Sequence, residues 1–143
     1  MVQVQEPSVR QDPPAPPKAV STWSGPAREQ AVQRMFTSIA GVYDLNNTLL
    51  SFGLHYRWKQ IAASFVTPVE QGTALDVGAG TADLALLVEP RMGATGRVVA
   101  SDLNYAMLAE GLKKVAGRGL TGKITCLQAS AEHLGFADNT FDA

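Results

Sequence analysis

The most informative stretch of this 143-residue sequence runs Leu75-Asp76-Val77-Gly78-Ala79-Gly80-Thr81-Ala82-Asp83. A short apolar run over residues 73–77 predicts a β-strand, and the two glycines that follow let the backbone turn sharply. We expect a helix from about Thr81 to Glu89, with partial positive charge on its first amide groups. The stretch therefore predicts a strand, a glycine-rich turn and a helix, a combination suited to holding a ligand.

The alternation of strands and helices continues beyond this turn. The sequence predicts a second strand over residues 97–101, a helix over 104–115 and a third strand over 123–127. Such alternation is typical of right-handed crossover units and a parallel sheet covered on both faces. Residues 141–143 resemble the start of a fourth strand. We interpret the chain as the first half of a doubly wound, Rossmann-like α/β fold, truncated after about three strands, and therefore as a fragment of a longer protein.

The part before the first strand divides into a tail and three helices. Six of the eight prolines lie in the first 26 residues, so we predict a disordered Pro-rich tail over residues 1–25 and a folded part over 26–143. Helices are expected over about 24–39, with Ser24 as the N-cap, and over 46–50 and 54–65. Apolar residues recur at helical spacing in the first and third of these helices: Val32, Met35, Phe36 and Ile39, then Trp58, Ile61, Ala62 and Phe65. Of these we predict Met35, Phe36 and Trp58 to be core rather than ligand wall, with a lid formed by the stacked helices as the alternative.

Composition excludes several classes of function. Twelve Lys and Arg against thirteen Asp and Glu give a net charge of −1, which disfavours a nucleic-acid binder. One cysteine, Cys126, cannot close an internal disulfide or supply a cysteine-based zinc cluster. With only two histidines besides, we predict no metal site. No apolar stretch approaches the ~20 residues of a membrane span, and no secretory signal is present, so the expected location is cytoplasmic.

Charge around the glycine turn indicates the ligand. Asp102 ends the second predicted strand, 102−80=22 residues after Gly80, where an acid can accept hydrogen bonds from ribose hydroxyls. A dinucleotide fingerprint requires glycine at the position of Asp83. Together with Asp76, this carboxylate would repel a pyrophosphate, whereas the ammonium and sulfonium groups of S-adenosylmethionine tolerate it. We therefore predict S-adenosylmethionine as the cofactor, and a dehydrogenase is a remote alternative.

The loop after the third predicted strand, residues 128–136, is a second candidate contact. Its backbone amides and Ser130 could recognise the edge of an adenine, although an ordinary turn is an equal alternative. The role of Asp76 is also open at this point. It could reach the ligand's amino group through water, or it could only fix the loop by accepting backbone amides.

Several further motifs carry a resemblance to a known family. They are Met35-Phe36-Thr37-Ser38-Ile39-Ala40 with Tyr43-Asp44, Ser51-Phe52-Gly53-Leu54-His55 with Trp58-Lys59, the glycine turn, Ala100-Ser101-Asp102, and Ala137-Asp138-Asn139-Thr140-Phe141-Asp142. On these motifs, residues 32–143 resemble the ubiquinone/menaquinone biosynthesis C-methyltransferases. The family's turn usually reads Gly-Thr-Gly-Asp, whereas this chain has Ala82, and Ser130 stands where Asn is frequent.

The resemblance implies a class I S-adenosylmethionine-dependent methyltransferase fold with a helical lid over residues 26–66 and a cofactor-binding half over 73–143. The implied reaction transfers a methyl group to a ring carbon of a polyprenylated quinol, either demethylmenaquinol or a related benzoquinol. The alternatives are a methyltransferase of another small-molecule class and a non-catalytic fragment. Together with the turn geometry, the expected cofactor contacts are Asp76, Gly78, Gly80, Thr81, Asp102, Ser130 and Ala131.

Three side chains are candidates for catalysis or for contact with the substrate. His55 is the best available general base because its ordinary pKa lies near neutrality, and a surface or helix-cap histidine is the alternative. Tyr43 and Asp44 could cover the substrate mouth as a lid, or serve as a turn residue and an N-cap. A lipophilic quinol also makes peripheral membrane association an option, whereas Lys113 and Lys114 are expected on a solvated helix face.

Overall fold

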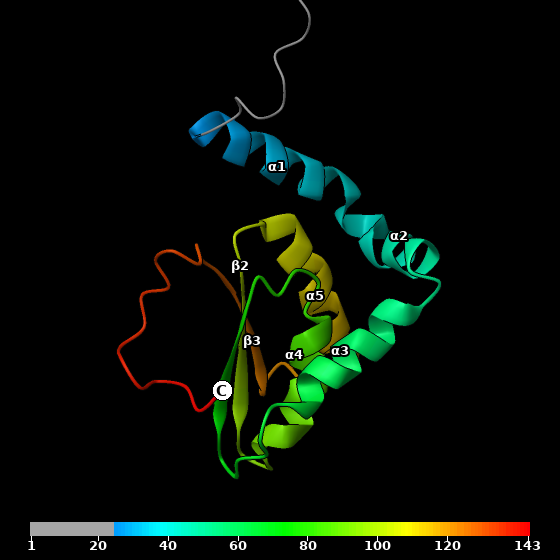
Figure 1. Cartoon of the computed structure of the whole chain (residues 1–143). Helices are drawn as coiled ribbons and strands as arrows, with labels where there is room; N and C mark the ends of the chain where they lie inside the picture. Colours follow the sequence, from blue (N-terminus) through cyan, green and yellow to red (C-terminus); the bar gives the residue numbers. More distant parts are fainter. Residues whose placement is uncertain (1–24) are drawn as a thin grey trace, which may run out of the picture.

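A parallel three-stranded sheet is the centre of the computed structural model, which describes residues 25–143 (Figure 1). The tail predicted over residues 1–25 and the cap predicted at Ser24 lie outside the described residues, except for Gly25. The strands are β1 (Thr73–Val77), β2 (Arg97–Asp102) and β3 (Ile124–Gln128), in the order β1-β2-β3. Thr73 pairs with Arg97, and Val98 pairs with Ile124. The predicted α/β class and parallel sheet are therefore confirmed.

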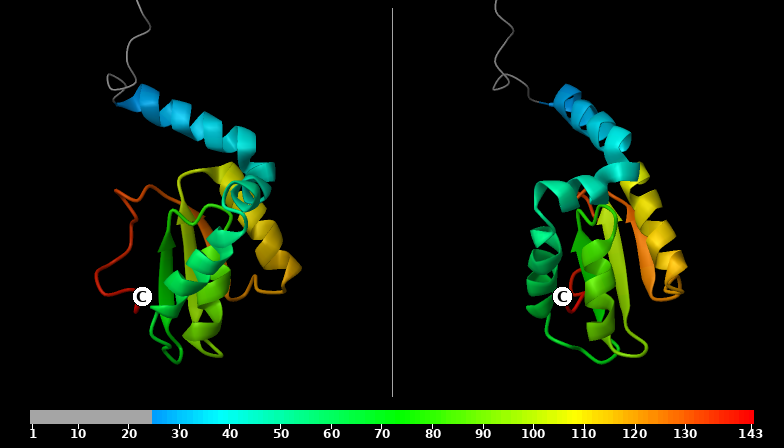
Figure 2. Two further views of the ribbon diagram at one scale, coloured as in Figure 1. Left: turned by 45° about the vertical axis from the view of Figure 1, so that its right-hand side comes forward. Right: turned by 90° about the vertical axis from the view of Figure 1, so that its right-hand side faces the viewer.

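The helices of residues 54–64, 83–88 and 105–117 lie on one face of this sheet, and the helix of residues 26–39 crosses the end of the sheet. Residues 129–143 cross the other face without a helix or strand (Figures 1 and 2). Helices on both faces were expected, so that prediction is wrong for the part of the chain described. The helical elements are α1 (Pro26–Ile39), η2 (Ala40–Val42), α2 (Tyr43–Leu50), α3 (Leu54–Ser64), α4 (Asp83–Val88), η3 (Glu89–Met92) and α5 (Tyr105–Gly117).

The core lies between the sheet and the helices α4 and α5. Its fully buried large side chains are Met92, Val98, Val115 and Ile124. Small residues let α5 approach the glycine turn closely. A β-carbon on Gly111 of α5 would lie 3.0 Å from the Ala82 β-carbon, so a larger side chain at residue 111 would push the two apart. The glycine turn is thus packed directly against α5, which fixes the start of α4.

Residues 142 and 143 lie along the free edge of β1. The Asp142 amide donates to the Thr73 carbonyl at 2.8 Å, and the Leu75 amide donates to the Ala143 carbonyl at 2.8 Å. This pairing is where a fourth strand begins in the predicted topology. A strand that continued this pairing would reverse the strand order beside β1, and ligands of doubly wound folds bind at such a point.

The boundaries of two predicted helices need correction. The helix expected from Thr81 starts at Asp83 because Ala82 has a left-handed backbone (φ 60°) and extends the turn. It also becomes the 3₁₀ helix η3 at Glu89, where Pro90 cannot donate the next helical hydrogen bond. The helix expected over 46–50 begins earlier, at Tyr43.

The apolar residues of the first helices are not the core that their spacing predicts. Met35 is 50% exposed, Trp58 is 59% exposed, and Ile61 and Phe65 are also exposed. The buried side of α3 carries His55 and Ala63 instead. Helical spacing identifies an apolar face of a helix, but it does not show which face becomes buried. That depends on the neighbour against which the helix packs, which for α3 is α4.

Candidate functional site

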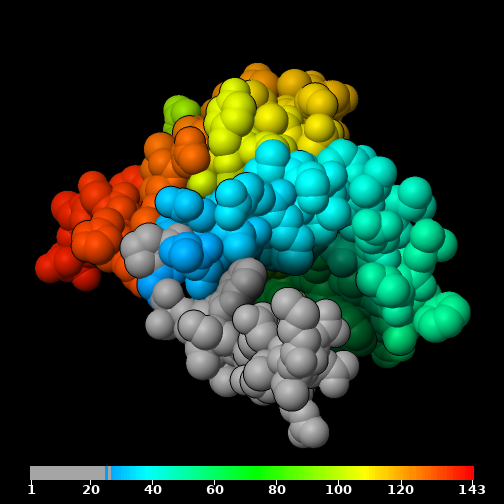
Figure 3. Space-filling view, turned by 90° about the horizontal axis from the view of Figure 1, so that it is seen from above, coloured from blue at the N-terminus to red at the C-terminus, as the bar shows by residue number. Residues whose placement is uncertain are grey.

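A cavity of about 480 Å³ lies at the carboxyl ends of the three strands, beneath α1. Its walls include Gln33 of α1, Gly78 after β1 and Asp102 at the end of β2, and the loop 129–132 after β3 closes one side. A smaller cavity of about 170 Å³ shares Gln33, Gly78 and Asp102 and extends to Tyr43 and Gly80. Figure 3 shows α1 crossing this end of the molecule, between the segment after β3 and the helices α2 and α3.

The glycine turn presents open backbone to these cavities. Gly78 has φ 73°, and a β-carbon there would meet nothing within 4 Å, so it would project into free space. The amides of Gly78 and Ala79 both donate to the Ser101 carbonyl, at 2.8 and 2.9 Å. These bonds tie the turn to β2 and hold the backbone at the wall, where a ligand can approach it closely.

Asp102 is held in place by backbone amides from two directions. The Gly80 amide donates to Oδ2 at 2.8 Å, and the Asn104 amide donates to Oδ1 at 2.7 Å. Each carboxylate oxygen keeps acceptor capacity beyond one bond. The carboxylate is therefore fixed at the wall of both cavities and can still accept hydrogen bonds from a ligand.

The loop after β3 also lies where the sequence predicts. The Ala129 amide donates to the Asp102 carbonyl at 3.1 Å, which brings the loop to the end of β2. Ser130 and Ala131 line the larger cavity. The Ser130 hydroxyl accepts from the Glu132 amide at 3.3 Å, a long bond that leaves its own proton available. Of the predicted residues, the structure thus brings Gly78, Gly80, Asp102, Ser130, Ala131 and Tyr43 to the cavities.

Helix α1 forms the roof of the site, and the sequence did not show which of its residues line the cavities. Phe36 was predicted to be core rather than ligand wall, but it lines the smaller cavity, and Val32 of the same apolar stripe lines both. The same apolar spacing fits a core face and a cavity wall equally well. A residue far along the chain decides between them, because it fixes where α1 lies.

That residue is Asn104, which is only 5% exposed. Its Oδ1 accepts from the Met107 amide at 3.1 Å and caps α5. Its Nδ2 donates to the Gln33 carbonyl and side chain, both at 2.9 Å, and to the Thr37 hydroxyl at 3.0 Å. An asparagine before a helix signals a cap from sequence alone, but its contact with α1 spans 71 residues and has no local signal.

Asp76 lies outside both cavities. Its Oδ2 accepts from the Ala85 amide at 3.1 Å, which satisfies one of the free amides in the first turn of α4. Burial raises the pKa of Asp76, and the repulsion of Asp102 adds to this, against the opposing effect of the Ala85 amide. Of the two roles left open by the sequence, this geometry favours fixing the loop.

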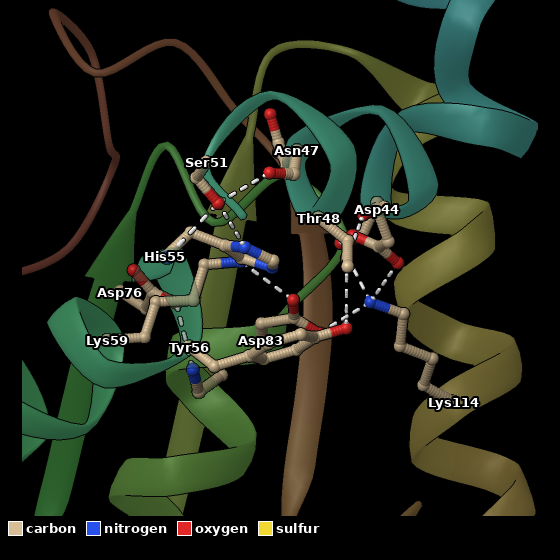
Figure 4. A network of polar contacts seen from close by, with 12 residues as sticks. Asp44, Asn47, Thr48, Ser51, His55, Tyr56, Lys59, Asp76, Asp83 and Lys114 are labelled. Atoms are coloured by element: carbon tan, nitrogen blue, oxygen red, sulfur yellow. Dashed lines mark hydrogen bonds and ion pairs between the residues drawn. The ribbon is translucent and has the colours of Figure 1, made fainter. Parts of the chain in front are cut away.

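Thr81 and Asp44 contact each other outside the cavities, and Figure 4 shows Asp44 beside Lys114. Thr81 is 3% exposed, and its hydroxyl donates to Asp44 Oδ1 at 2.7 Å. Neither side chain lines the two cavities. Lys114 joins this group, so the expectation that it lies on a solvated face is wrong, whereas Lys113 is indeed exposed. A cofactor contact by Thr81 would have to use its backbone.

His55 is buried where α2 meets α3, and it does not line either cavity. Only 7% exposed, it is not the surface histidine considered as an alternative. Its Nδ1 lies 2.9 Å from the Ser51 hydroxyl, and its Nε2 has no hydrogen-bond partner among the described residues. Its role as a general base stays a prediction, and this placement gives it no contact with the cavity walls.

Two kinds of feature are absent from the described part of the chain. In residues 25–143, no three His, Cys, Asp or Glu side chains are placed to hold a metal ion together. Over the same residues, no helix combines the length and the apolar character needed to cross a membrane.

Comparison with known proteins places the chain in a family. The model of the ubiE/COQ5 methyltransferase family matches residues 25–143. A ubiquinone/menaquinone biosynthesis C-methyltransferase UbiE from Haemophilus ducreyi is 43% identical over 115 residues, 80% of this chain and 44% of that protein. One from Klebsiella pneumoniae (strain 342) is 41% identical over 116 residues, 80% of this chain and 46% of that protein. The chain thus spans a little under half the length of these relatives.

Solved structures agree on the fold. A SAM-dependent methyltransferase from Aquifex aeolicus superposes with a TM-score of 0.51 at 26% identity, covering 59% of this chain and 44% of that one. The [4+2]-cyclase SpnF gives a TM-score of 0.59 at 21% identity, covering 77% of this chain and 46% of that one. The chain belongs to the ubiE/COQ5 methyltransferase family and has the Rossmann-like fold of S-adenosylmethionine-dependent methyltransferases.

Proposed function

We propose that the chain binds S-adenosylmethionine in the larger cavity and serves the transfer of its methyl group to a ring carbon of a polyprenylated quinol. The observation that carries this proposal is the meeting of the Asp102 carboxylate and the open backbone of Gly78 at one cavity beneath α1. The names of the curated relatives, which are ubiquinone/menaquinone biosynthesis C-methyltransferases, support the substrate class.

The residues present fit this cofactor in size and charge. A volume of about 480 Å³ falls within the range of about 300–1,000 Å³ typical of small-molecule sites. Three carboxylates, Glu29, Asp102 and Glu132, line the cavity against a single guanidinium, Arg28. This excess of negative charge suits the ammonium and sulfonium groups and disfavours a pyrophosphate.

The chain's own residues would act by binding and orientation. S-adenosylmethionine supplies a methyl group that is already a strong electrophile. Asp102 would accept hydrogen bonds from the ribose hydroxyls, and the loop of Ser130 and Ala131 would meet the adenine. Val32 and Phe36 would give the cofactor an apolar wall. Alignment of the methyl group with an electron-rich ring carbon would then supply much of the acceleration.

An exposed apolar surface where α2 meets α3 supports a lipophilic substrate. Leu49, Leu50, Phe52 and Leu54 are all exposed, and Phe52 at the junction of α2 and α3 is 94% exposed. Contiguous apolar residues on a protein surface mark sites that meet another apolar phase. We propose that this α2–α3 junction contacts the membrane that holds the quinol, and vesicle flotation of Phe52→Ser against the wild-type chain tests it. Equal flotation of both would contradict membrane contact at this surface.

Calorimetric titration of S-adenosylmethionine into the chain tests the cofactor site. We expect Asp102→Asn to weaken binding at least about tenfold, the loss expected when a charge-assisted hydrogen bond is removed. The matched control is Asp138→Asn, which changes an exposed carboxylate outside both cavities. A folded wild-type chain that does not bind, or equal affinity of the wild type and Asp102→Asn, would overturn the proposed site.

Methyl transfer is tested separately by mass spectrometry with a labelled methyl donor. Short-tailed demethylmenaquinol and the corresponding benzoquinol are offered in competition, and we expect label on a ring carbon of one of them. Cofactor binding without transfer to either quinol would contradict the proposed reaction while leaving the cofactor site in place.

A further inference from the structure

Five polar side chains form one cluster at the glycine turn, and Figure 4 labels all of them except Thr81. We call it the clasp, and its members are Asp44 of α2, Lys59 of α3, Thr81 of the glycine turn, Asp83 at the start of α4, and Lys114 of α5. Lys114 Nζ lies 2.5 Å from Asp44 Oδ2, 2.5 Å from Asp83 Oδ1 and 2.8 Å from the Thr81 hydroxyl. Lys59 Nζ donates to Asp83 Oδ2 at 2.7 Å.

The clasp is balanced in charge and partly removed from solvent. Two lysines face two aspartates, and the Lys114 and Asp83 side chains are only 27% and 18% exposed. Burial by itself would raise the pKa of Asp83, but the hydrogen bonds from Lys114 and Lys59 outweigh it and lower that pKa. Removing one partner would leave a half-buried charge without compensation, which costs more than losing an exposed surface pair.

The roof of the cavity has little other anchorage. None of the described side chains of α1 or α2 is buried, and η2 between them buries only Ala40. Their position therefore depends strongly on polar contacts. Asn104 holds α1 at Gln33 and Thr37, and the clasp holds α2 at Asp44. Because α1 continues through η2 into α2, these are two attachments of one lid.

We infer that Lys114 and Asp44 are positioning residues that hold the lid over the cofactor cavity, although neither side chain lines that cavity. Lys114 contacts the lid through Asp44 and the glycine turn through Thr81. One ammonium group therefore sets the distance between the lid and the glycine turn. Loosening this contact frees the lid and shortens the residence of the cofactor. The inference rests on the proposed cofactor site.

The neighbouring lysine provides a matched control. Among residues 25–143, Lys113 pairs with Glu110 alone, on the exposed side of the same helix, and its side chain is 71% exposed. We compare Lys114→Met, Lys114→Arg, Asp44→Asn and Lys113→Met in the full chain. The S-adenosylmethionine dissociation constant and dissociation rate are measured well below the melting temperature of every variant.

We expect Lys114→Met to raise the dissociation constant about tenfold, a loss typical of coupled charged neighbours, mainly through faster dissociation. Lys113→Met should stay within about twofold of wild type, and Lys114→Arg should recover most of the affinity because it keeps the charge. The double variant Asp44→Asn with Lys114→Met should bind no more weakly than Lys114→Met alone, because both changes break the same contact.

A merely structural role would lower the melting temperature of Lys114→Met and leave both cofactor constants unchanged, and that result would overturn the inference. If Lys114→Met does not fold, Asp44→Asn carries the same expectation, because Lys114 then keeps Asp83 as its partner. A wild-type chain that binds no cofactor would instead overturn the proposed site and this inference with it.

Discussion

The strand–helix part, residues 73–128, and the helical segment before it, residues 26–64, are stabilised in different ways. In the first, sheet and helices bury a shared apolar core that includes Val98 and Ile124. In the second, the buried described side chains are only Ala40, His55 and Ala63, and polar contacts of Asn104 and Lys114 join α1 and α2 to the strand–helix part. Apolar burial is non-directional and fixes a fold robustly, whereas a few polar contacts fix a position that can be released. This contrast suits a rigid cofactor platform under a lid.

The same glycine-to-alanine change in each part is the strongest test of this contrast. A β-carbon on Gly96 would lie 2.5 Å from the Met92 β-carbon and closer still to its carbonyl oxygen, whereas one on Gly41 would meet nothing within 4 Å. We expect Gly96→Ala to lower the free energy of unfolding by about 3 kcal/mol or more through overpacking. Gly41→Ala should change it by less than about 1 kcal/mol, in the stabilising direction. Urea denaturation measures both, and similar values would contradict the contrast.

Asn104 is the residue where the two parts meet, so its loss should affect both. Asn104→Ala removes the cap of α5 and the three contacts of Nδ2 with α1. We expect the free energy of unfolding to fall by about 2 kcal/mol, at the upper end for a cap. Amide hydrogen exchange in α1 should accelerate more than exchange in β2. Uniform acceleration across both elements would mean that Asn104 does not hold the roof.

The pH dependence of stability should have opposite signs at two carboxylates. Asp83 has a pKa below its ordinary 3.8, so the stability it contributes is present above that pH and is lost as the pH falls through its folded pKa. Asp83→Asn should therefore cost stability at pH 7, by about 1 kcal/mol for a half-buried pair, and this cost should vanish in acid. Burial raises the pKa of Asp76, so wild type should gain stability relative to Asp76→Asn as the pH falls toward 3.8. Denaturation midpoints between pH 3 and 7 measure both, and equal signs would refute this assignment.

The smallest effect is expected on the exposed apolar surface of the helical segment. Phe52 is 94% exposed, so Phe52→Ser removes almost no buried area. The free energy of unfolding should change by no more than about 0.5 kcal/mol. Urea denaturation measures this change. If the free energy of unfolding fell by more than about 1 kcal/mol, the size of a typical destabilising mutation, this side chain would have to be packed against the protein in solution.

Features that depend on neighbouring residues in the sequence could be predicted, whereas features that depend on contacts between distant residues could not. The strand at residues 73–77 and the turn at Gly78 and Gly80 were predicted because apolar runs and glycines act locally. Asp102 was predicted because strand, turn and helix fix its place at the sheet edge. The faces of α1 and α3 were predicted wrongly, since an apolar stripe does not say whether it meets a core, a cavity or solvent.

The sequence by itself determined the parallel sheet, the ligand-accepting turn and the acid beside it, since these depend on backbone preferences and hydrophobic period within a few residues. Only the tertiary structure decided that Asn104 holds α1 and that Lys114 holds Asp44 and Thr81. Those contacts join residues 33 to 71 positions apart. They exist because docked helices bring the side chains together, and no local pattern records that arrangement.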